Sequence, residues 1–188
     1  MSKVILVSAT PVEHGGLKEL NGIPIFQVGI GKINAASNLT EILWNEEPDV
    51  VINFGSCGNL KNHKVGKVIE VGTVYNNIDV RPYAQYGCTP ENNVCEIKLS
   101  DSRIKLFTTD QIYDKTRKDY AKKYLDMIKE CDIVDMEGYA IAYVCKQRNI
   151  PFYSYKWVSD DGNVDSWKEN ASIGFNTFKN NLNNYLQK

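Results

Sequence analysis

The feature that most constrains the fold is an alternation of two hydrophobic periods along the chain. Nearly continuous apolar runs of strand length recur, and segments with helical spacing lie between them. Several runs are rich in β-branched residues, which is typical of strands buried on both faces of a sheet. The pattern therefore predicts an α/β fold with a mostly parallel or mixed sheet. The strand-length runs are residues 3–9, 23–29, 49–55, 66–75, 103–110, 132–137 and 151–160.

Four segments are predicted to be helical from their spacing of apolar residues. They are residues 32–46, 114–130, 138–147 and the C-terminal segment 166–188. In the first segment one stripe is expected to face the core, formed by Ile33, Ala36, Leu39, Ile42 and Leu43. Residues 76–98 have weak periodicity, which predicts a long loop of a kind that is usually functional or mobile.

Length and charge limit the class of protein. The chain has 188 residues and a formal net charge of -1, which predicts a single domain over residues 1–188 and gives no electrostatic case for nucleic acid or an anionic membrane as a partner. No window approaches the ~20 apolar residues of a transmembrane span. The first apolar run is too short for the hydrophobic region of a signal peptide. We therefore expect a cytoplasmic protein.

The cysteines and histidines indicate neither a disulfide framework nor a metal site. The five cysteines are odd in number and form no C-x-x-C motif, and the chain has only two histidines. Reduced cytosolic thiols and no bound metal are therefore expected. The histidines, His14 and His63, lie in segments typical of loops and are predicted to be surface residues. The cysteines are Cys57, Cys88, Cys95, Cys131 and Cys145.

Glycine-bearing turns follow three of the predicted strands. They are "VGIGK" (28–32), "FGSCGNL" (54–60) and "SDDGN" (159–163). Such turns let a backbone approach a ligand closely, although a plain strand-to-helix turn explains each of them equally well. None is a G-x-G-x-x-G or a P-loop, so neither nucleotide fingerprint applies.

Three carboxylates and a hydroxyl follow predicted strands. In open α/β sheets, ligands bind outside the carboxyl ends of the strands, where Glu13, Ser56, Glu137 and Asp160 would lie. Together the three acids could perform acid–base chemistry without a metal or a nucleophilic cysteine. For each acid taken alone, a solvated loop position or a helix N-cap is the better explanation.

The stretch "IVDMEGYAIAYVC" (133–145) places two of the chain's acids in an apolar run. Glu137 falls at the predicted start of a helix, where a carboxylate is favoured. Asp135 precedes it by two residues and is predicted to point to the opposite face in a structural role, so we expect that the two acids are not a pair.

Four motifs, in order over nearly the whole chain, resemble the nucleoside phosphorylase/nucleosidase superfamily, and most of all its 5'-methylthioadenosine/S-adenosylhomocysteine nucleosidase branch. The resemblance implies a three-layer α/β/α fold with a central mixed sheet, nucleoside phosphorylase-like in its topology. The motifs are "VILVSATPVE", "VGIGKINAA", "DVVINFGSCGNL" and the pair "VDMEGYAIAYVC" and "YKWVSDDGN".

The resemblance also implies six site residues and no cofactor. Glu13 would activate the attacking water, and Asp160 would hydrogen-bond purine N7 and protonate the leaving base. Met136 and Glu137 would hold the ribose, with Ser56 near the ribose and the nucleophile. Ile112 stands where the family has an aromatic residue that stacks on adenine.

The function implied is that of a purine nucleosidase, which hydrolyses 5'-methylthioadenosine or S-adenosylhomocysteine to free base and thioribose. Two alternatives stay open: a phosphate-dependent purine nucleoside phosphorylase, and a catalytically silent nucleoside-binding module. Arginine suits a phosphate site, yet none lies beside the glycine turns, and only Arg81 in the long loop is a candidate. Departures from the family at Asn59, Ile112 and Gly138-Tyr139 leave the base open, with hypoxanthine possible.

The stretch "NNIDVRPYAQYGCTPE" (76–91) resembles the loop that members of this branch bring to a neighbouring subunit's active site. It implies a homodimer, with Pro82, Tyr83 and Tyr86 as contacts across the interface. The alternative is an exposed connection without a partner.

Overall fold

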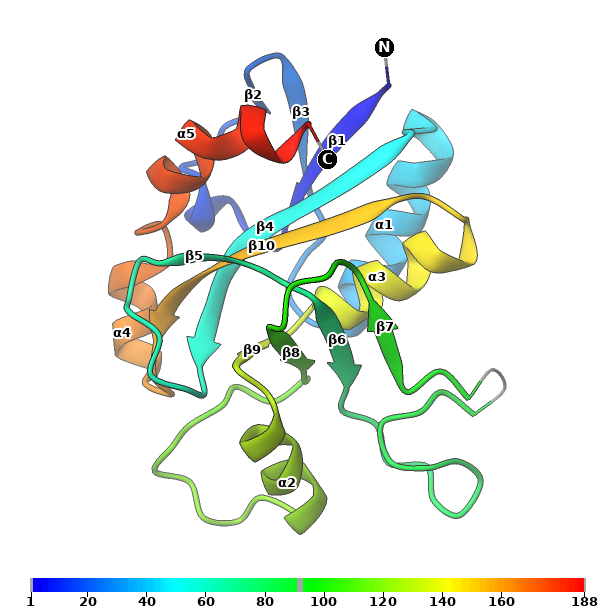
Figure 1. Cartoon of the computed structure of the whole chain (residues 1–188), viewed down its shortest axis with the longest axis vertical. Helices are drawn as coiled ribbons and strands as arrows, with labels where there is room; N and C mark the ends of the chain where they lie inside the picture. Colours follow the sequence, from blue (N-terminus) through cyan, green and yellow to red (C-terminus); the bar gives the residue numbers. More distant parts are fainter. Residues whose placement is uncertain (1, 91–92, 188) are drawn as a thin grey trace.

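The computed structural model of the chain describes residues 2–90 and 93–187, and a ten-stranded sheet forms its centre (Figure 1). Residue 188 of the predicted C-terminal helix and residues 91–92 of the predicted loop lie outside the described residues. The strands are β1 (Val4–Ser8), β2 (Glu19–Leu20), β3 (Ile23–Gln27), β4 (Val50–Asn59), β5 (Val68–Glu70), β6 (Thr73–Asn76), β7 (Glu96–Lys98), β8 (Lys105–Thr108), β9 (Ile133–Asp135) and β10 (Phe152–Asp160). The helices are η1 (Pro11–Glu13), α1 (Lys32–Glu46), α2 (Lys122–Glu130), α3 (Gly138–Gln147), α4 (Val164–Asn170) and α5 (Phe175–Tyr185).

The sheet is mixed, as predicted. Its parallel centre joins β3, β1, β4 and β10, and a second parallel group joins β6, β8 and β9. The long strand β4 connects the two groups, because its last residues, Gly58 and Asn59, pair antiparallel with β9. The short strands β2, β5 and β7 add antiparallel partners.

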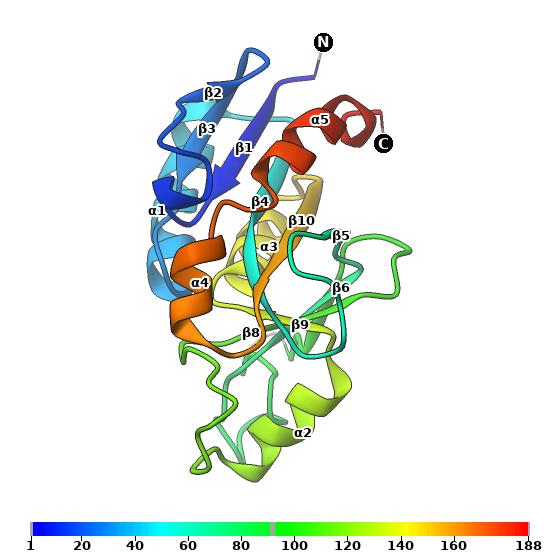
Figure 2. The ribbon, with the colours of Figure 1, turned by 90° about the vertical axis from the view of Figure 1, so that its left-hand side faces the viewer.

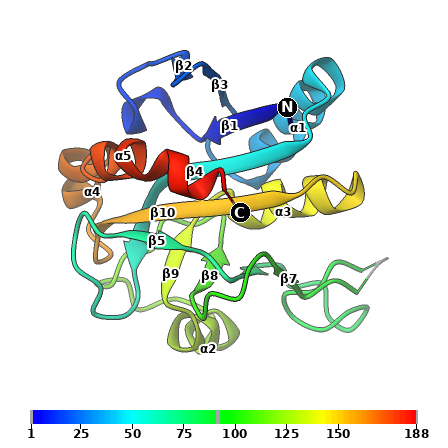
Figure 3. The same ribbon diagram turned by 45° about the horizontal axis from the view of Figure 1, so that its top comes forward.

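Alternate residues of the central strands enter two different cores, because successive strand side chains point to opposite faces. Ile5 and Val7 of β1 pack with α1 and α3, whereas Leu6 packs with Phe178 and Leu182 of α5. Figure 2 shows α1 and α5 on opposite sides of β1 and β4. The predicted three-layer α/β/α arrangement is therefore confirmed. A third, smaller core joins side chains of α2, β8 and β9. Figure 3 shows α2 at the bottom of the view, below these two strands.

Helices α1 and α3 have the predicted bounds, but the prediction that Ile33 of α1 faces the core is wrong. Ile33 is 84% exposed, and the buried residues of α1 are Ala35, Leu39 and Leu43. The helix turns its Ala35 side toward α3, so that Ile33 in its first turn faces outward.

Two predicted segments are interrupted where a glycine lies against a neighbour. The predicted strand 66–75 divides into β5 and β6, because the chain turns at Gly72, where a Cβ would lie 1.7 Å from the Ser102 carbonyl oxygen. The predicted helix 166–188 likewise divides into α4 and α5 before Gly174, where a Cβ would lie 2.2 Å from the Trp157 ring. No side chain larger than hydrogen fits at either junction.

The predicted helix 114–130 is shorter than expected. Only Lys122–Glu130 is helical, and at the start of the predicted helix the Asp114 carboxylate accepts the Thr116 backbone N–H at 2.8 Å. Such local side-chain bonds compete with helix formation. Strands β2 and β7, of two and three residues, are too short to show a period and were not predicted.

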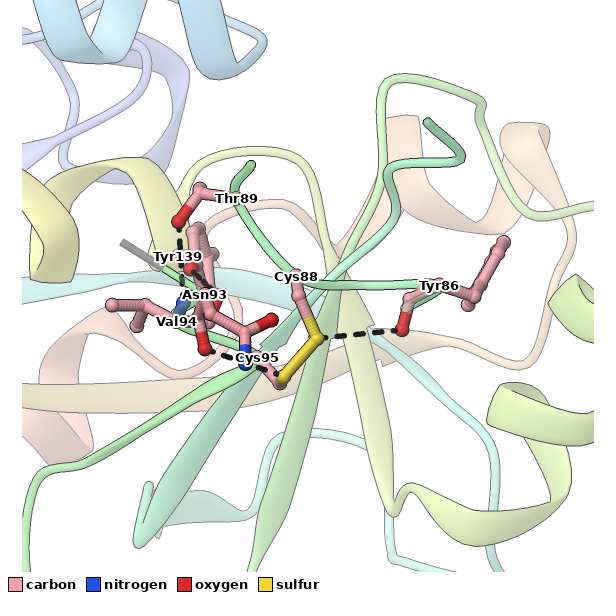
Figure 4. The surroundings of a disulfide bond; sticks show 7 residues. All are labelled: Tyr86, Cys88, Thr89, Asn93, Val94, Cys95 and Tyr139. Atoms are coloured by element: carbon pink, nitrogen blue, oxygen red, sulfur yellow. Dashed lines mark hydrogen bonds between the residues drawn. A yellow bond between two sulfur atoms is a disulfide. The ribbon is translucent and has the colours of Figure 1, made fainter. Parts of the chain in front are cut away.

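The long loop between β6 and β7 contains a disulfide bond, so the expectation that all five thiols are reduced is wrong. Cys88 is bonded to Cys95 (Figure 4). The cysteines at 57, 131 and 145 are free and buried. The loop is tied to α3, because the Tyr139 hydroxyl donates to the Val94 carbonyl oxygen at 2.7 Å. The sequence pattern could not show this pairing, because it depends on where the loop folds back.

The helices of the described residues are all too short or too polar to cross a membrane.

Phe178 anchors α5 to the sheet and allows a test of this core. It is fully buried and stacks on Phe54 with ring centroids 4.8 Å apart. We expect Phe178→Ala to lower the free energy of unfolding by about 3–5 kcal/mol, because it removes a buried ring and leaves a cavity. Urea unfolding followed by circular dichroism measures the change. Leu186→Ala, at a residue 38% exposed, is the control; equal losses in both variants would contradict this packing.

Candidate active site

A cavity of about 220 Å³ lies at the carboxyl ends of β1, β4 and β10. These strands are parallel, so their ends meet at one edge of the sheet, as ligand sites in open α/β sheets do. The structure brings all the predicted site residues together in its lining: Glu13, Ser56, Ile112, Met136, Glu137 and Asp160.

Glu13 is held by hydrogen bonds at the end of η1. Its Oε1 accepts the Ser56 backbone N–H at 2.7 Å and the Ser56 hydroxyl at 2.8 Å, whereas Oε2 has only a long contact of 3.4 Å with the Thr10 N–H. A Cβ on Gly55 would lie 2.6 Å from Oε1, so this close approach requires glycine. Burial raises the pKa of Glu13, and the charge of Lys156 and the Ser56 hydrogen bonds oppose that rise.

Glu137 occupies the N-cap position of α3, as predicted, but its carboxylate binds a different helix. Its Oε1 accepts the backbone N–H of Gly31 at 2.9 Å, at the start of α1. Gly31 has φ 88°, a conformation that favours glycine. Burial raises the pKa of Glu137 to about 8, and the negative charge of Asp135 adds to the rise.

A buried lysine that the sequence analysis missed faces these acids. The Lys156 Nζ lies 2.9 Å from Asp135 Oδ2, and both side chains are almost fully buried. Burial alone would lower the pKa of Lys156, but the charges of Asp135, Glu137 and Glu13 together raise it. The sequence did contain a signal for this residue: Lys156 is a lone charge inside the apolar run of β10, just as Asp135 and Glu137 are charges inside the apolar run 133–145.

The prediction that Asp135 and Glu137 point to opposite faces and are not a pair is wrong, because both line the cavity and the charges of both act on Lys156. The negative charge of Asp135 raises the pKa of Glu137, and the charges of both carboxylates raise the pKa of Lys156. Asp135 also accepts the Thr108 hydroxyl at 2.7 Å and the Gly138 N–H at 2.9 Å. It thereby connects β8 and α3 to the lysine on β10.

Asp160 ends β10 and is fixed by its immediate neighbours. Its Oδ1 accepts the Gly162 N–H at 2.9 Å, and its Oδ2 lies 2.8 Å from the Ser159 hydroxyl. The adjacent Asp161 is exposed and pairs with Lys115. Only the first of the two consecutive acids lines the cavity.

The mouth of the cavity is apolar and partly exposed. Ile30 is 49% exposed and Ile112 57% exposed, and both line the cavity. Other lining residues that the sequence analysis did not single out are Gln111, Tyr113, Val134, Val164 and Trp167. None of the described residues lining the cavity is an arginine, and Arg81 pairs with Asp79 in the long loop.

His14 is buried, so its prediction as a surface residue is wrong. It is 2% exposed and meets Phe54 edge-on, with ring centroids 5.8 Å apart. Its ring joins the aromatic core under α5, and burial lowers its pKa. The other histidine, His63, lies 4.0 Å from Asp132 and is partly exposed.

Comparison with known proteins identifies relatives over most of the chain. Residues 102–187 match the family model of the phosphorylase superfamily. The 5'-methylthioadenosine/S-adenosylhomocysteine nucleosidase of Haemophilus influenzae is 32% identical over 182 residues, covering 85% of this chain and 76% of the relative. The predicted resemblance to that branch is confirmed.

Solved structures confirm the nucleoside phosphorylase-like fold. A variant of the Helicobacter pylori 5'-methylthioadenosine/S-adenosylhomocysteine nucleosidase, with 5'-methylthioadenosine in its active site, superposes with a TM-score of 0.83 at 18% identity, covering 100% of this chain and 99% of that one. The futalosine hydrolase of the same organism has a TM-score of 0.83 at 17% identity, covering 99% and 97%.

The raised pKa of Glu137 predicts a pH dependence of stability. A carboxyl with a higher pKa in the folded than in the unfolded state stabilises the fold fully below its ordinary pKa of 4.5, and this stabilisation is lost as the pH rises through about 8. We expect the unfolding free energy of the wild type to fall more steeply than that of Glu137→Gln between about pH 5 and pH 9. The glutamine keeps an acceptor for the Gly31 N–H.

Chemical unfolding of both proteins across this pH range measures the difference. Glu41→Gln, at an exposed position on α1, is the control and should follow the wild type. Parallel curves for the wild type and Glu137→Gln would contradict the assignment.

Proposed function

The chain belongs to the 5'-methylthioadenosine/S-adenosylhomocysteine nucleosidase family, and we propose that it hydrolyses the N-glycosidic bond of a purine nucleoside. The substrate we propose is 5'-methylthioadenosine or S-adenosylhomocysteine, which would give free adenine and a thioribose. The observation that carries the proposal is the position of Glu13, Glu137 and Asp160 around one cavity.

The charges around the cavity suit this reaction. Cleavage of a glycosidic bond passes through an oxocarbenium-like transition state, with positive charge on the sugar and negative charge on the departing base. Fixed carboxylates stabilise the first charge, and a proton donor neutralises the second. We assign the first role to Glu13 and Glu137 and the second to Asp160, which must carry a proton when the base leaves.

The hydrogen bonds of Glu13 support its role as the base. Because Ser56 occupies Oε1 with two donors, Oε2 is the atom with room to accept a proton from water. Glu137 likewise uses Oε1 for Gly31, which leaves Oε2 for the ribose hydroxyls. Met136, next to it in the lining, would pack against the sugar.

Water is the nucleophile that we propose, in preference to phosphate. A phosphorylase needs a cationic site for the anion, usually with arginine. No arginine is among the described residues that line the cavity, and Lys156 is already surrounded by carboxylates. Ile30 and Val164, two apolar residues that line the cavity, suit a thioether substituent at the 5' position.

We propose further that the whole chain, residues 1–188, acts as one domain and forms a homodimer through the long loop. Tyr83 of that loop is 90% exposed, and Ile33 and Trp44 on α1 are 84% and 74% exposed. Apolar side chains this exposed are common at interfaces between subunits.

A cytoplasmic location stays a prediction, and the Cys88–Cys95 bond is the observation against it.

The reaction is tested by incubating the protein with 5'-methylthioadenosine, S-adenosylhomocysteine and inosine, with and without phosphate, and separating the products by chromatography. We expect adenine and a free thioribose at rates independent of phosphate. A sugar 1-phosphate formed only with phosphate would establish the phosphorylase. Tight binding of a nucleoside without release of base would establish the silent binding module.

Asp160→Asn and Glu13→Gln test the assigned roles in the same assay. Each should lower kcat by about 100-fold or more, because general acid–base catalysis contributes about 10²–10⁴-fold. Asp161→Asn is the matched control, since this neighbouring carboxylate pairs with Lys115 outside the cavity. Wild-type turnover in both site variants would make the assignment wrong.

The homodimer is tested by size-exclusion chromatography with light scattering. We expect twice the mass of one chain, and we expect Tyr83→Asp to shift the protein toward the monomer because it places a charge in the interface. A fully active wild-type monomer would contradict the proposal.

A further inference from the structure

Trp167 is connected to Glu13, the proposed general base, by two hydrogen bonds that pass through the Ser56 hydroxyl. The indole lies in α4 and lines the cavity, and its Nε1–H donates to Ser56 Oγ at 3.1 Å. The same hydroxyl donates to Glu13 Oε1 at 2.8 Å. The three side chains come from α4, β4 and η1, so the chain of hydrogen bonds connects elements far apart in sequence.

The direction of these hydrogen bonds follows from the groups involved. An indole N–H can only donate, and a serine hydroxyl has one hydrogen to give. Because Ser56 Oγ accepts from Trp167, its own hydrogen is left for Glu13. Glu13 Oε1 also accepts the Ser56 backbone N–H, so this oxygen receives two donors and does not carry a proton itself.

We propose that Trp167 is a positioning residue for hydrolysis: it fixes the Ser56 hydroxyl as a donor to Glu13 and so keeps the Glu13 carboxylate ionised, with Oε2 turned to the attacking water. This inference rests on the proposed function and adds a residue from outside the motifs that indicated the family.

The charges around Glu13 show why the donor matters. Burial raises the pKa of Glu13, and the opposing influences are the charge of Lys156 and the Ser56 hydrogen bonds. Glu137 at the start of α3 and Cys57 on β4 also lie within electrostatic reach. A Trp167 variant leaves all of these groups in place and changes only how reliably the Ser56 hydroxyl donates.

The position of α4 is determined by β10, the strand that carries Asp160. At its end, the Asn170 side chain donates to the Ser159 carbonyl oxygen at 3.0 Å, and the Trp157 Nε1–H donates to the Ala171 carbonyl oxygen at 2.9 Å. At its start, the Asn163 side chain caps the helix. Helix α4, which follows the proposed general acid Asp160, therefore also carries the residue that orients the proposed general base Glu13.

Trp167→Phe is the test, because phenylalanine keeps an aromatic ring and removes the N–H. We expect kcat/KM near neutral pH to fall by about tenfold, the most that one neutral hydrogen bond usually contributes. The acid limb of the pH profile of kcat/KM should move to higher pH, because a weaker donor lets the Glu13 carboxyl hold its proton longer. The KM should change little.

A double-mutant cycle with Ser56→Ala separates this role from packing. The Ser56→Ala background lacks the hydroxyl that connects Trp167 to Glu13. Adding Trp167→Phe to it should therefore not move the acid limb of the pH profile further. Trp157→Phe is the matched control: Trp157 is paired with Ser56 through the backbones of β10 and β4, but its indole N–H donates to the Ala171 carbonyl oxygen and not to the Ser56 hydroxyl. This variant should lower stability and leave the acid limb where it is in the wild type.

Three results would overturn the inference: an acid limb in Trp167→Phe that matches the wild type, an equal shift with and without Ser56, or the same shift in Trp157→Phe. The ¹³C chemical shift of the Glu13 carboxyl against pH gives a second readout that needs no turnover, and its midpoint should rise in Trp167→Phe. A wild type that cleaves no nucleoside, with that midpoint still rising, would overturn the proposed function and leave only the hydrogen-bonded orientation of Glu13.

Discussion

The ion pair between Lys156 and Asp135 is the interaction on which the rest of the site depends. Both side chains are almost fully buried, where two charges are stable only with close pairing and further hydrogen bonds. Asp135 meets this condition through Thr108 on β8 and the Gly138 N–H on α3. The pair therefore holds β8, β10 and α3 together, and the start of α3 is where Glu137 is placed. Loss of one partner would leave a buried charge unpaired, which usually costs about 3–5 kcal/mol.

The balance of charge around Lys156 relates the fold to the proposed chemistry. One cation faces three carboxyl groups, those of Asp135, Glu137 and Glu13, so the buried cluster becomes net negative once all three are ionised. Burial raises the pKa of Glu137 and the negative charge of Asp135 adds to that rise, whereas ionised carboxylates favour a positive charge developing on a bound sugar. The same cavity is without arginine among its described lining residues, which makes it a poor site for phosphate. Burial of Glu137 thus favours its protonated form, whereas the proposed reaction requires its charged form.

Much of the fold and the outline of the site could be predicted from the sequence, because both depend on local patterns. The helical period placed α1 and α3, and polar residues after strands placed Glu13, Ser56 and Asp160 at one edge. The features that could not be predicted depend on contacts through space. Lys156 lies within a quoted motif, but its contact with the acids depends on how β10 packs against β9 and α3, and Trp167 reaches the site from a short helix outside every motif. The Cys88–Cys95 bond and the divisions at Gly72 and Gly174 likewise follow from how distant segments meet.

The central claim is that one cavity holds the sugar between Glu13 and Glu137 and the base at Asp160. A crystal structure of the chain with a non-hydrolysable analogue of 5'-methylthioadenosine tests it most directly. We predict that the ribose hydroxyls bind Glu137, that purine N7 lies within hydrogen-bond distance of Asp160, and that a water bound to Glu13 faces the anomeric carbon. An analogue bound with its base away from Asp160, or bound outside this cavity, would contradict the account.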